Sequence, residues 1–427
     1  MRATLVICLC FLTLASCDNW AVIVAGSNTY SNYRHQSNVY HLYKILRTFG
    51  MPESNIITFA YDDIANNKRN PIPGQVFNRP DGEDVYAGVK IDFVGEDVTA
   101  SNFIAALTGD ASSIRTTDPR STPKVLQSTQ NDHVFVYYSD HGGDNIIAFP
   151  NEYLYADELN NALKTMHSKN MYSKLVFYLE ACHSGSMFAN WLPSDINVYA
   201  VSAARPNEDH YGTYCGSAAV VHGINIGSCL GGQFSTSFME DVDAQGQGLA
   251  SETLQQQFEL LQQKVTLSHV VQYGDVSFVN SDSLYNYISG TAKKFLAKLI
   301  KIVVGAFRTL EEDKNVLVSG TKARLEFYKN LAESTNDLSD QMEYYTEITK
   351  EAISQKRFKL FSKMFNLPSE SLNTKVDFSC YKRLVNKYAQ KCDALIDRDY
   401  KYMTNFANFC RAGLNVEEAE GALDKLC

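Results

Sequence analysis

The chain has 427 residues, of which 45% are hydrophobic and 20% charged. This balance is that of an ordinary globular protein and excludes a disordered one, and the length is sufficient for two domains. The formal net charge is −9 and the basic residues form no stripe, so we expect no nucleic-acid partner.

The first seventeen residues predict a secretory signal. Arg2 precedes an apolar run over residues 5–14, and small residues follow at 15–17 as a cleavage site. The run is too short to span a membrane, and we expect no other span. The mature chain therefore enters an oxidising route in which disulfides persist.

Seven cysteines follow the predicted signal: Cys182, Cys215, Cys229, Cys380, Cys392, Cys410 and Cys427. An odd number, with one cysteine in a tight turn, suggests three bridges and one free thiol. Cys215 and Cys229 would close a Gly-rich loop, and the last four would staple the C-terminal region in any of three pairings. No Asn-x-Ser/Thr site is present, so N-glycosylation is not expected.

Short apolar runs alternate with helical patterns in the first two thirds of the chain. Strands are predicted at 19–26, 56–61, 134–138, 174–179 and 197–203, with helices at 36–49 and 156–166. Residues 66–100 are rich in Pro, Gly and Asn and predict an irregular excursion. The fold class is therefore α/β, with a mostly parallel sheet flanked by helices.

The pattern changes after about Ser289. Apolar residues recur at helical spacing and strand signals vanish, so an all-helical, disulfide-stapled region is expected, including an amphipathic helix over 295–307. Residues 289–427 hold 23 Lys and Arg and 19 Asp and Glu, a net of +4, which leaves −13 for residues 1–288. The two parts should attract each other.

Two candidate catalytic side chains follow neighbouring predicted strands. His141 and Gly142 come after the strand at 134–138, and Cys182 comes after the strand at 174–179. Because open α/β sheets place their chemistry at the carboxyl ends of strands, we expect the imidazole and the thiol at one edge. A base, or a helix beginning at Ser184, would favour the nucleophilic thiolate.

The same residues have structural interpretations. A free Cys is often a buried structural residue, and a lone His can simply cap a strand end. The pairing of Asp-His-Gly with Glu-Ala-Cys at one edge favours catalysis, with the backbone N–H groups of Gly142 and Cys182 as a candidate oxyanion hole. His183 is a weaker candidate base, because adjacent side chains usually point apart.

These motifs resemble the caspase-like cysteine peptidases and, within them, the legumain family of asparaginyl endopeptidases and vacuolar processing enzymes. The resemblance covers about residues 19–280 through VIVAGSN, NYRHQ, YDDIA, NPIPG, NRPDG, VYAGV, GEDVT, DHVFVYYSDHGG, MYSKLVFYLEACHSGSM, INVYA, MEDVD and SHVVQYG. It continues more thinly through STNDL and the spacing of the last four cysteines.

The resemblance implies a caspase-like fold and a division of the chain. Its parts would be a signal peptide (1–17), a catalytic domain (18–288), an activation peptide (289–336) and a helical prodomain (337–427) like the legumain stabilisation and activity modulation domain. It also implies the pairs Cys380–Cys410 and Cys392–Cys427, and autoprocessing at Asn336.

The resemblance assigns roles to several residues. Cys182 resembles the nucleophile, His141 the general base and Asn32 the residue that orients the imidazole, while Asp140 resembles a succinimide-prone aspartate. Arg34, His35 and Glu180 match a pocket for the side chain before the scissile bond. A carboxamide offers a donor and an acceptor, which an Arg and a carboxylate can read together. A structural salt bridge between Arg34 and Glu180 is the alternative.

The pocket departs from the family pattern. Gly232 stands where the family usually has Asp, and Glu208-Asp209-His210 stands where Glu-Ser-Ser is usual. We hypothesise that Asp209 restores the missing negative charge. The alternative is a relaxed pocket with a weaker preference for Asn.

The sequence thus predicts an acid-activated cysteine endopeptidase zymogen that cleaves peptides and proteins after Asn, and after Asp at lower pH, through a thioester. Neither cofactor nor metal is expected, and the prodomain is the expected inhibitor. The resemblance leaves open a peptide ligase activity and cystatin-type inhibitors, and it implies a lysosome-like or vacuole-like compartment or secretion. The alternatives are a transamidase-type relative and a catalytically quiet binding protein.

Overall fold

A six-stranded sheet forms the centre of the computed structural model, which describes residues 18–290, 315–334, 337–372, 374–392 and 398–427. The strand order is β13 (Val271–Gly274), β8 (Val198–Ser202), β7 (Lys174–Glu180), β3 (His133–Ser139), β1 (Asn19–Ala25) and β2 (Ile56–Phe59). All neighbours are parallel except β13, which pairs antiparallel with β8. The predicted mostly parallel sheet is confirmed.

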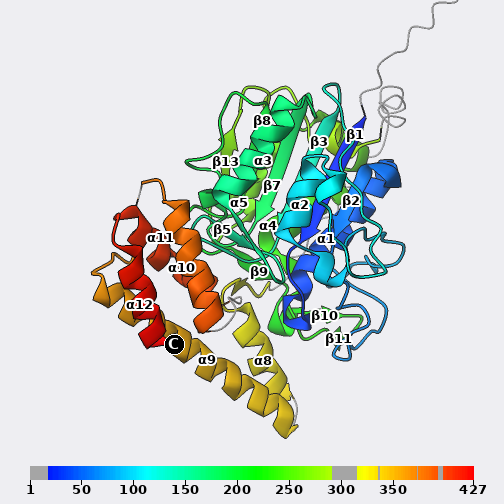
Figure 1. Ribbon diagram of the computed structural model, residues 1–427. Coiled ribbons are helices and arrows are strands. Elements are labelled where there is room, and N and C mark those ends of the chain that lie inside the picture. The colour runs from blue at the N-terminus through cyan, green and yellow to red at the C-terminus, as the bar shows by residue number, and fades with distance from the viewer. Residues whose placement is uncertain (1–17, 291–314, 335–336, 373, 393–397) are drawn as a thin grey trace, which may run out of the picture.

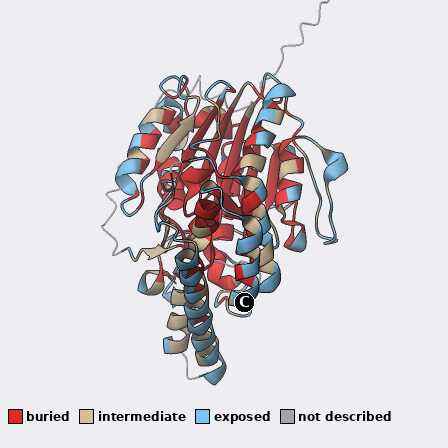
Figure 2. Ribbon diagram, turned by 60° about the vertical axis from the view of Figure 1, so that its left-hand side comes forward, coloured by how far each residue is buried: buried red, intermediate tan, exposed pale blue. Residues whose placement is uncertain are grey.

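Helices cover both faces of the sheet (Figure 1). One apolar cluster joins the sheet to α1 (Tyr33–Thr48), α4 (Gln233–Gln245), α5 (Leu254–Lys264) and α6 (Tyr285–Ile288), and a second joins it to α2 (Ala100–Leu107) and α3 (Ala156–Ser168). The central strands are buried on both sides, as Figure 2 shows. This double cover explains why they read as continuous apolar runs instead of alternating ones.

Several very short strands lie around the sheet. They are β4 (Gly142–Gly143), β5 (Ile146–Ala148), β6 (Tyr153–Tyr155), β9 (Tyr211–Thr213), β10 (Val220–Val221), β11 (Ile224–Asn225), β12 (Gly231–Gly232) and β14 (Val318–Ser319). The expectation that strands vanish after Ser289 was wrong, because β14 pairs with the edge of β9. A strand of two residues is too short to produce a period in the sequence.

The C-terminal part is helical, as predicted: α8 (Ala323–Ser334), α9 (Leu338–Met364), α10 (Phe378–Lys391), α11 (Met403–Arg411) and α12 (Val416–Leu426). Side chains of Asp337, Asp377 and Asn415 accept backbone N–H bonds at the first turns of α9, α10 and α12, which fixes where these helices begin. Disulfides join Cys380 to Cys410 and Cys392 to Cys427, the pairing that the resemblance implies.

Three expectations fall on residues outside the described ranges: the signal peptide, the helix over 295–307 and the processing site at Asn336. Within the described ranges, none of the helices combines the length and apolarity that crossing a membrane requires.

Candidate active site

His141 and Cys182 leave the same edge of the sheet. Strands β3 and β7 are hydrogen-bonded neighbours from the pair His133–Lys174 to the pair Ser139–Glu180, so their carboxyl ends coincide. The turn beyond β3 then packs against the turn beyond β7. A Cβ on Gly142 would lie 2.6 Å from the carbonyl oxygen of Cys182, so glycine is required for this close approach.

Cys182 is the free cysteine among the described residues, and it is buried. Its Sγ lies 3.2 Å from Nδ1 of His210. The helix expected at Ser184 is only the single 3₁₀ turn η5 (Ser184–Met187), too short to supply a substantial dipole. Burial, and then the charge of Asp209, raise the pKa of the Cys182 thiol well above its ordinary value. The thiol is therefore protonated in this covered state.

Asn32 orients His141. Its amide nitrogen donates to the carbonyl of Asn28 at 3.1 Å, which turns its Oδ1 toward Nε2 of His141 at 2.9 Å. Because the amide oxygen can only accept, Nε2 carries the imidazole hydrogen and Nδ1 is the basic nitrogen. Asn32 lies at the end of the 3₁₀ turn η1 (Tyr30–Asn32), just before α1. His183 turns away from this group, since its Nδ1 lies 3.0 Å from the carbonyl oxygen of Pro206.

A second imidazole, that of His35, packs against His141. Nδ1 of His35 lies 3.0 Å from the Asp140 carboxylate and 2.6 Å from the Ser27 hydroxyl, and the His35 ring meets the His141 ring edge-on at 5.0 Å. His35, Asp140 and His141 offer ligand atoms within 4.8 Å of one another and are the described residues best placed to hold a metal ion.

Glu180, which the resemblance assigns to a substrate pocket, is buried against the first turn of α4. Its carboxylate accepts from Asn38, Ser139, the hydroxyl and backbone N–H of Ser235, and the backbone N–H of Phe234. Burial raises the pKa of Glu180 to about 7. A Cβ on Gly232 would overlap the carboxylate oxygens. Glu180 thus occupies the space into which a side chain at position 232 would project.

Residues 315–320 lie against β9 and cover the thiol. Cys215 donates its backbone N–H to Val316 at 3.2 Å, Val318 pairs with Gly212, and Gly320 donates to the carbonyl of His210 at 2.9 Å. A Cβ on Gly320 would lie only 3.2 Å from Sγ of Cys182. This segment therefore occupies the edge along which an extended peptide could bind.

The hypothesised pocket residue Asp209 contacts the same segment. Its Oδ2 accepts hydrogen bonds from Oγ of Ser319 and from Oγ1 of Thr321, the latter at 2.8 Å. Its proposed compensation for Gly232 stays a prediction. Sequence reasoning noted His210 only as a departure and missed Gly320, because neither a buried imidazole nor a covering glycine has a sequence signature.

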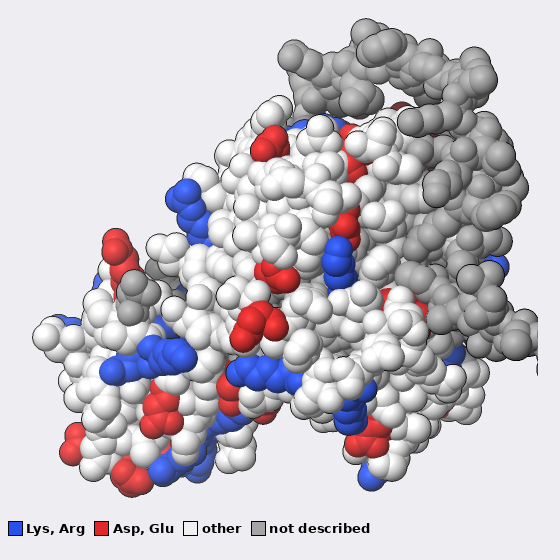
Figure 3. Space-filling model, turned by 90° about the horizontal axis from the view of Figure 1, so that it is seen from above, with Lys and Arg blue, Asp and Glu red and all other residues white. Residues whose placement is uncertain are grey.

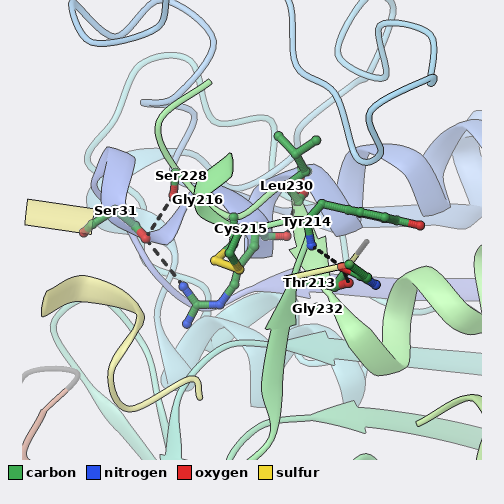
Figure 4. Close-up of a disulfide and its surroundings, with 12 residues drawn as sticks. Ser31, Thr213, Tyr214, Cys215, Gly216, Ser228, Leu230 and Gly232 are labelled. Atoms are coloured by element: carbon green, nitrogen blue, oxygen red, sulfur yellow. Dashed lines mark hydrogen bonds between the residues drawn. A yellow bond between two sulfur atoms is a disulfide. The ribbon is translucent and has the colours of Figure 1, made fainter. Parts of the chain in front are cut away.

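The Cys215–Cys229 disulfide fixes the position of β9, the strand with which residues 315–320 pair. Figure 4 shows it near Ser31 and Ser228, which are joined where the Ser228 hydroxyl donates to the Ser31 carbonyl at 3.3 Å. Nearby, the backbone N–H of Leu230 donates to the Tyr214 carbonyl at 3.2 Å. The bridge fastens β9 to β12, which carries Gly232. The disulfide therefore ties the edge that β14 covers to the strand that carries Gly232.

The helical region packs directly beside the site. A Cβ on Gly143 would lie 3.1 Å from Met403 Cβ and overlap the carbonyl of Tyr400, in the 3₁₀ turn η8 (Tyr400–Tyr402). The guanidinium of Arg411 holds both carboxylate oxygens of Asp144, at 2.7 and 2.8 Å. Both side chains are almost fully buried.

Other ion pairs cross the same boundary at its rim. Lys382 pairs with Asp157 and Glu158 at 3.1 and 2.6 Å. Arg69 pairs in the opposite sense, with Asp340 and Glu343 at 3.1 and 2.8 Å. On the face that Figure 3 shows, Lys and Arg side chains are interspersed with Asp and Glu. Charge thus contributes to the docking of the helical region through specific pairs.

A buried thiol and an imidazole at one sheet edge, covered by an extended segment, define the class as a cysteine peptidase held in a covered state. Residues 19–291 match the peptidase C13 family, and residues 337–427 match the legumain prodomain. The chain belongs to the peptidase C13 family; it is a cysteine endopeptidase with a C-terminal prodomain.

Two relatives, a vacuolar-processing enzyme and a legumain, agree with this assignment. The chain is 37% identical to a vacuolar-processing enzyme of Vicia sativa, over 96% of this chain and 85% of that one. It is also 37% identical to legumain of Mus musculus, over 96% of this chain and 92% of that one. A solved structure of caspase-1 from Spodoptera frugiperda covers 60% of this chain and 85% of its own, at 10% identity and a TM-score of 0.33.

Proposed function

We propose that this peptidase is an acid-activated zymogen that cleaves peptide bonds after Asn, and after Asp at lower pH, with Cys182 as nucleophile and His141 as acid and base. The observation that carries the proposal is the segment at residues 315–320, which pairs with β9 over Cys182 as a bound peptide would. The relatives named legumain and vacuolar-processing enzyme support the specificity.

The reaction begins when the covering segment leaves and a substrate pairs with β9. Nδ1 of His141 takes the thiol proton of Cys182, and Sγ attacks the carbonyl carbon of the scissile bond. The backbone N–H groups of Gly142 and Cys182 stabilise the oxyanion. The C–N bond breaks as His141 gives its proton to the leaving amine, which leaves a thioester.

Hydrolysis completes the cycle. Water loses a proton to His141 and attacks the thioester carbon, the C–S bond breaks, and the proton returns to the sulfur of Cys182. Asn32 keeps the imidazole in the tautomer that both half-reactions need. Arg34, His35 and Glu180 form the pocket for the side chain before the scissile bond.

Acid releases the block by weakening docking of the prodomain. Docking of the prodomain includes the ion pairs of Lys382 and of Arg69, and an ion pair is lost when its carboxylate is protonated. Asp144 behaves differently. Burial opposes its ionisation, but the hydrogen bonds and charge of Arg411, with Ser371, lower the pKa of Asp144 below its ordinary value. An acidic vacuole-like or lysosome-like compartment fits this activation.

The test brings purified zymogen from neutral pH to about pH 4.5, where ordinary carboxylates begin to protonate, beside Cys182→Ala. Mass spectrometry follows the chain, and matched peptides with Asn, Asp or Ala before the scissile bond report turnover. We expect loss of the C-terminal region and Asn-selective cleavage in the wild type alone. Equal turnover of all three peptides would remove the specificity, and no turnover under reducing acid conditions would remove the function.

A further inference from the structure

His210 fills the space that faces the covering segment beside the nucleophile. A Cβ on Gly320 would lie 2.6 Å from Cε1 and 2.9 Å from Nδ1 of the His210 ring. A side chain at position 320, which lies over Cys182, would therefore point directly at the His210 imidazole. Only a glycine can lie there while the ring keeps its place, and a substrate with a longer side chain must turn the ring aside.

The His210 ring presents a hydrogen-bond donor to this space. Burial, the charge of Arg34 and the neighbouring His141 lower the pKa of His210 well below its ordinary value, so the ring is neutral. Nδ1 faces the protonated thiol of Cys182, which can donate to it, and Nε2 then carries the hydrogen. Nε2 is buried and makes no hydrogen bond within the described residues.

Glu180 is a poor acceptor for a substrate carboxamide. Its Oε1 already accepts two backbone N–H bonds, and its Oε2 already accepts from three side chains. A carboxamide needs an acceptor for its NH₂ group, whereas a carboxylate needs only donors. Arg34, buried beside Gly212, supplies donors and a positive charge.

Asp209 lies on the other face of the covering strand. It binds the side chains of Ser319 and Thr321, and successive side chains of a strand point to opposite faces. A Cβ at position 320 points at the His210 ring, whereas the Asp209 carboxylate already accepts from the side chains on either side of it. Nε2 of His35 is the remaining candidate acceptor nearby. It could accept from the NH₂ group of a substrate Asn, so the pocket can still bind Asn.

We propose that His210 is the specificity-determining residue of this pocket and that it extends cleavage to Asp near neutral pH. In the covered state its ring fills the pocket beneath Gly320. In the substrate complex the displaced ring donates from Nε2, with Arg34, to a carboxylate side chain before the scissile bond. This role rests on the proposed peptidase function.

The first test measures kcat/KM for matched Asp and Asn peptides at about pH 6.5, where a substrate Asp is ionised. Acid-activated wild type, His210→Ala, His210→Gln and the exposed-site control His167→Ala are compared. We expect His210→Ala to lower the Asp-to-Asn ratio about tenfold or more, as for loss of one hydrogen bond to a charged group. His210→Gln retains an NH₂ donor and should restore much of the ratio, and His167→Ala should leave it unchanged.

The outcomes separate this role from the proposed function. Wild type that cleaves Asn but not Asp peptides at this pH, or a His210→Ala enzyme with an unchanged ratio, overturns the role of His210 and leaves the peptidase intact. Equal loss with both peptides also overturns it, because a structural defect lowers both. Wild type without turnover of any peptide refutes the proposed function.

The intact zymogen provides a readout that needs no turnover. At neutral pH we expect His210→Ala to change the rate at which iodoacetamide alkylates Cys182, because the ring no longer contacts Sγ. An alkylation rate equal to that of wild type would contradict the placement of His210 over the pocket.

Discussion

In the proposed mechanism, Asn32 acts on the reaction through the hydrogen of His141. Its amide is held by Asn28, so its oxygen selects one imidazole tautomer, in which Nδ1 is the nitrogen that we propose takes the thiol proton. This role of Asn32 involves neither the substrate pocket nor residues 315–320. It therefore predicts an effect on turnover that is separate from substrate binding.

Substituting Asn32→Ala should lower kcat about a hundredfold, within the range for general acid–base catalysis, with a much smaller change in KM. Kinetics with an Asn peptide on acid-activated enzyme measure both. Asn28→Ala, which removes no backbone carbonyl, is the matched control and should retain most of the activity. A change confined to KM would contradict the orienting role.

Sequence reasoning located Cys182 and His141 because each follows a long apolar run, and strand ends can be placed from such runs. It could not place the Glu180 carboxylate in the space beside Gly232, since that depends on the start of α4, where two backbone N–H groups meet the carboxylate. The position of His210 against Sγ likewise depends on the path of a loop. Contacts of this kind leave no period or spacing in a sequence.

At the level of elements, β14 forms because it can pair with the edge of β9 that faces away from β12. The long strands β1, β3 and β7 could be predicted from their apolar runs, whereas the C-terminal region was predicted only as helical, without the bounds of its helices. In contrast, β14 has two residues and gains its structure from its partner. Short strands that form only by pairing with a neighbour are therefore the part of this fold that cannot be predicted from the sequence.

Gly320→Ala tests whether β14 covers the site as a fitted element. The added methyl group meets the His210 ring at 2.6 Å and Sγ at 3.2 Å, so the strand or the ring must shift. We expect faster alkylation of Cys182 by iodoacetamide in the zymogen at neutral pH, by about threefold to tenfold, for a cost of about 1 kcal/mol in strand docking. Gly223→Ala, at a left-handed position with open space around it, is the control for glycine replacement. An unchanged rate in Gly320→Ala would show that β14 does not limit access.

Across the whole molecule, Asp144 and Arg411 form a buried ion pair that joins the peptidase part to the prodomain. The pKa of Asp144 is lowered in the docked state, so its contribution to docking is present above the ordinary aspartate range and is lost only as the pH falls through the lower, docked value. The pair therefore stays charged below the ordinary aspartate range, and we expect it to delay release of the prodomain to more acidic conditions.

Arg411→Gln should move prodomain release to higher pH. Removing one partner of a buried pair leaves an uncompensated charge and costs about 3–5 kcal/mol. Mass spectrometry and size-exclusion chromatography across a pH series measure the midpoint of release. Arg383→Gln, whose partners Glu417 and Glu420 lie within the helical region, should leave that midpoint near the wild-type value. A midpoint in Arg411→Gln that is unchanged or more acidic would contradict the role of the pair.

The register of β3 against β7 has a consequence for the timing of activation. His141 and Cys182 are held by neighbouring strands of the central sheet, and both strands are already fully formed while the thiol is covered. No catalytic strand has to fold or change partners when the enzyme becomes active. The lag before the first turnover should therefore measure how fast residues 315–320 and the prodomain leave the site. The two catalytic side chains need no rearrangement of the sheet beforehand.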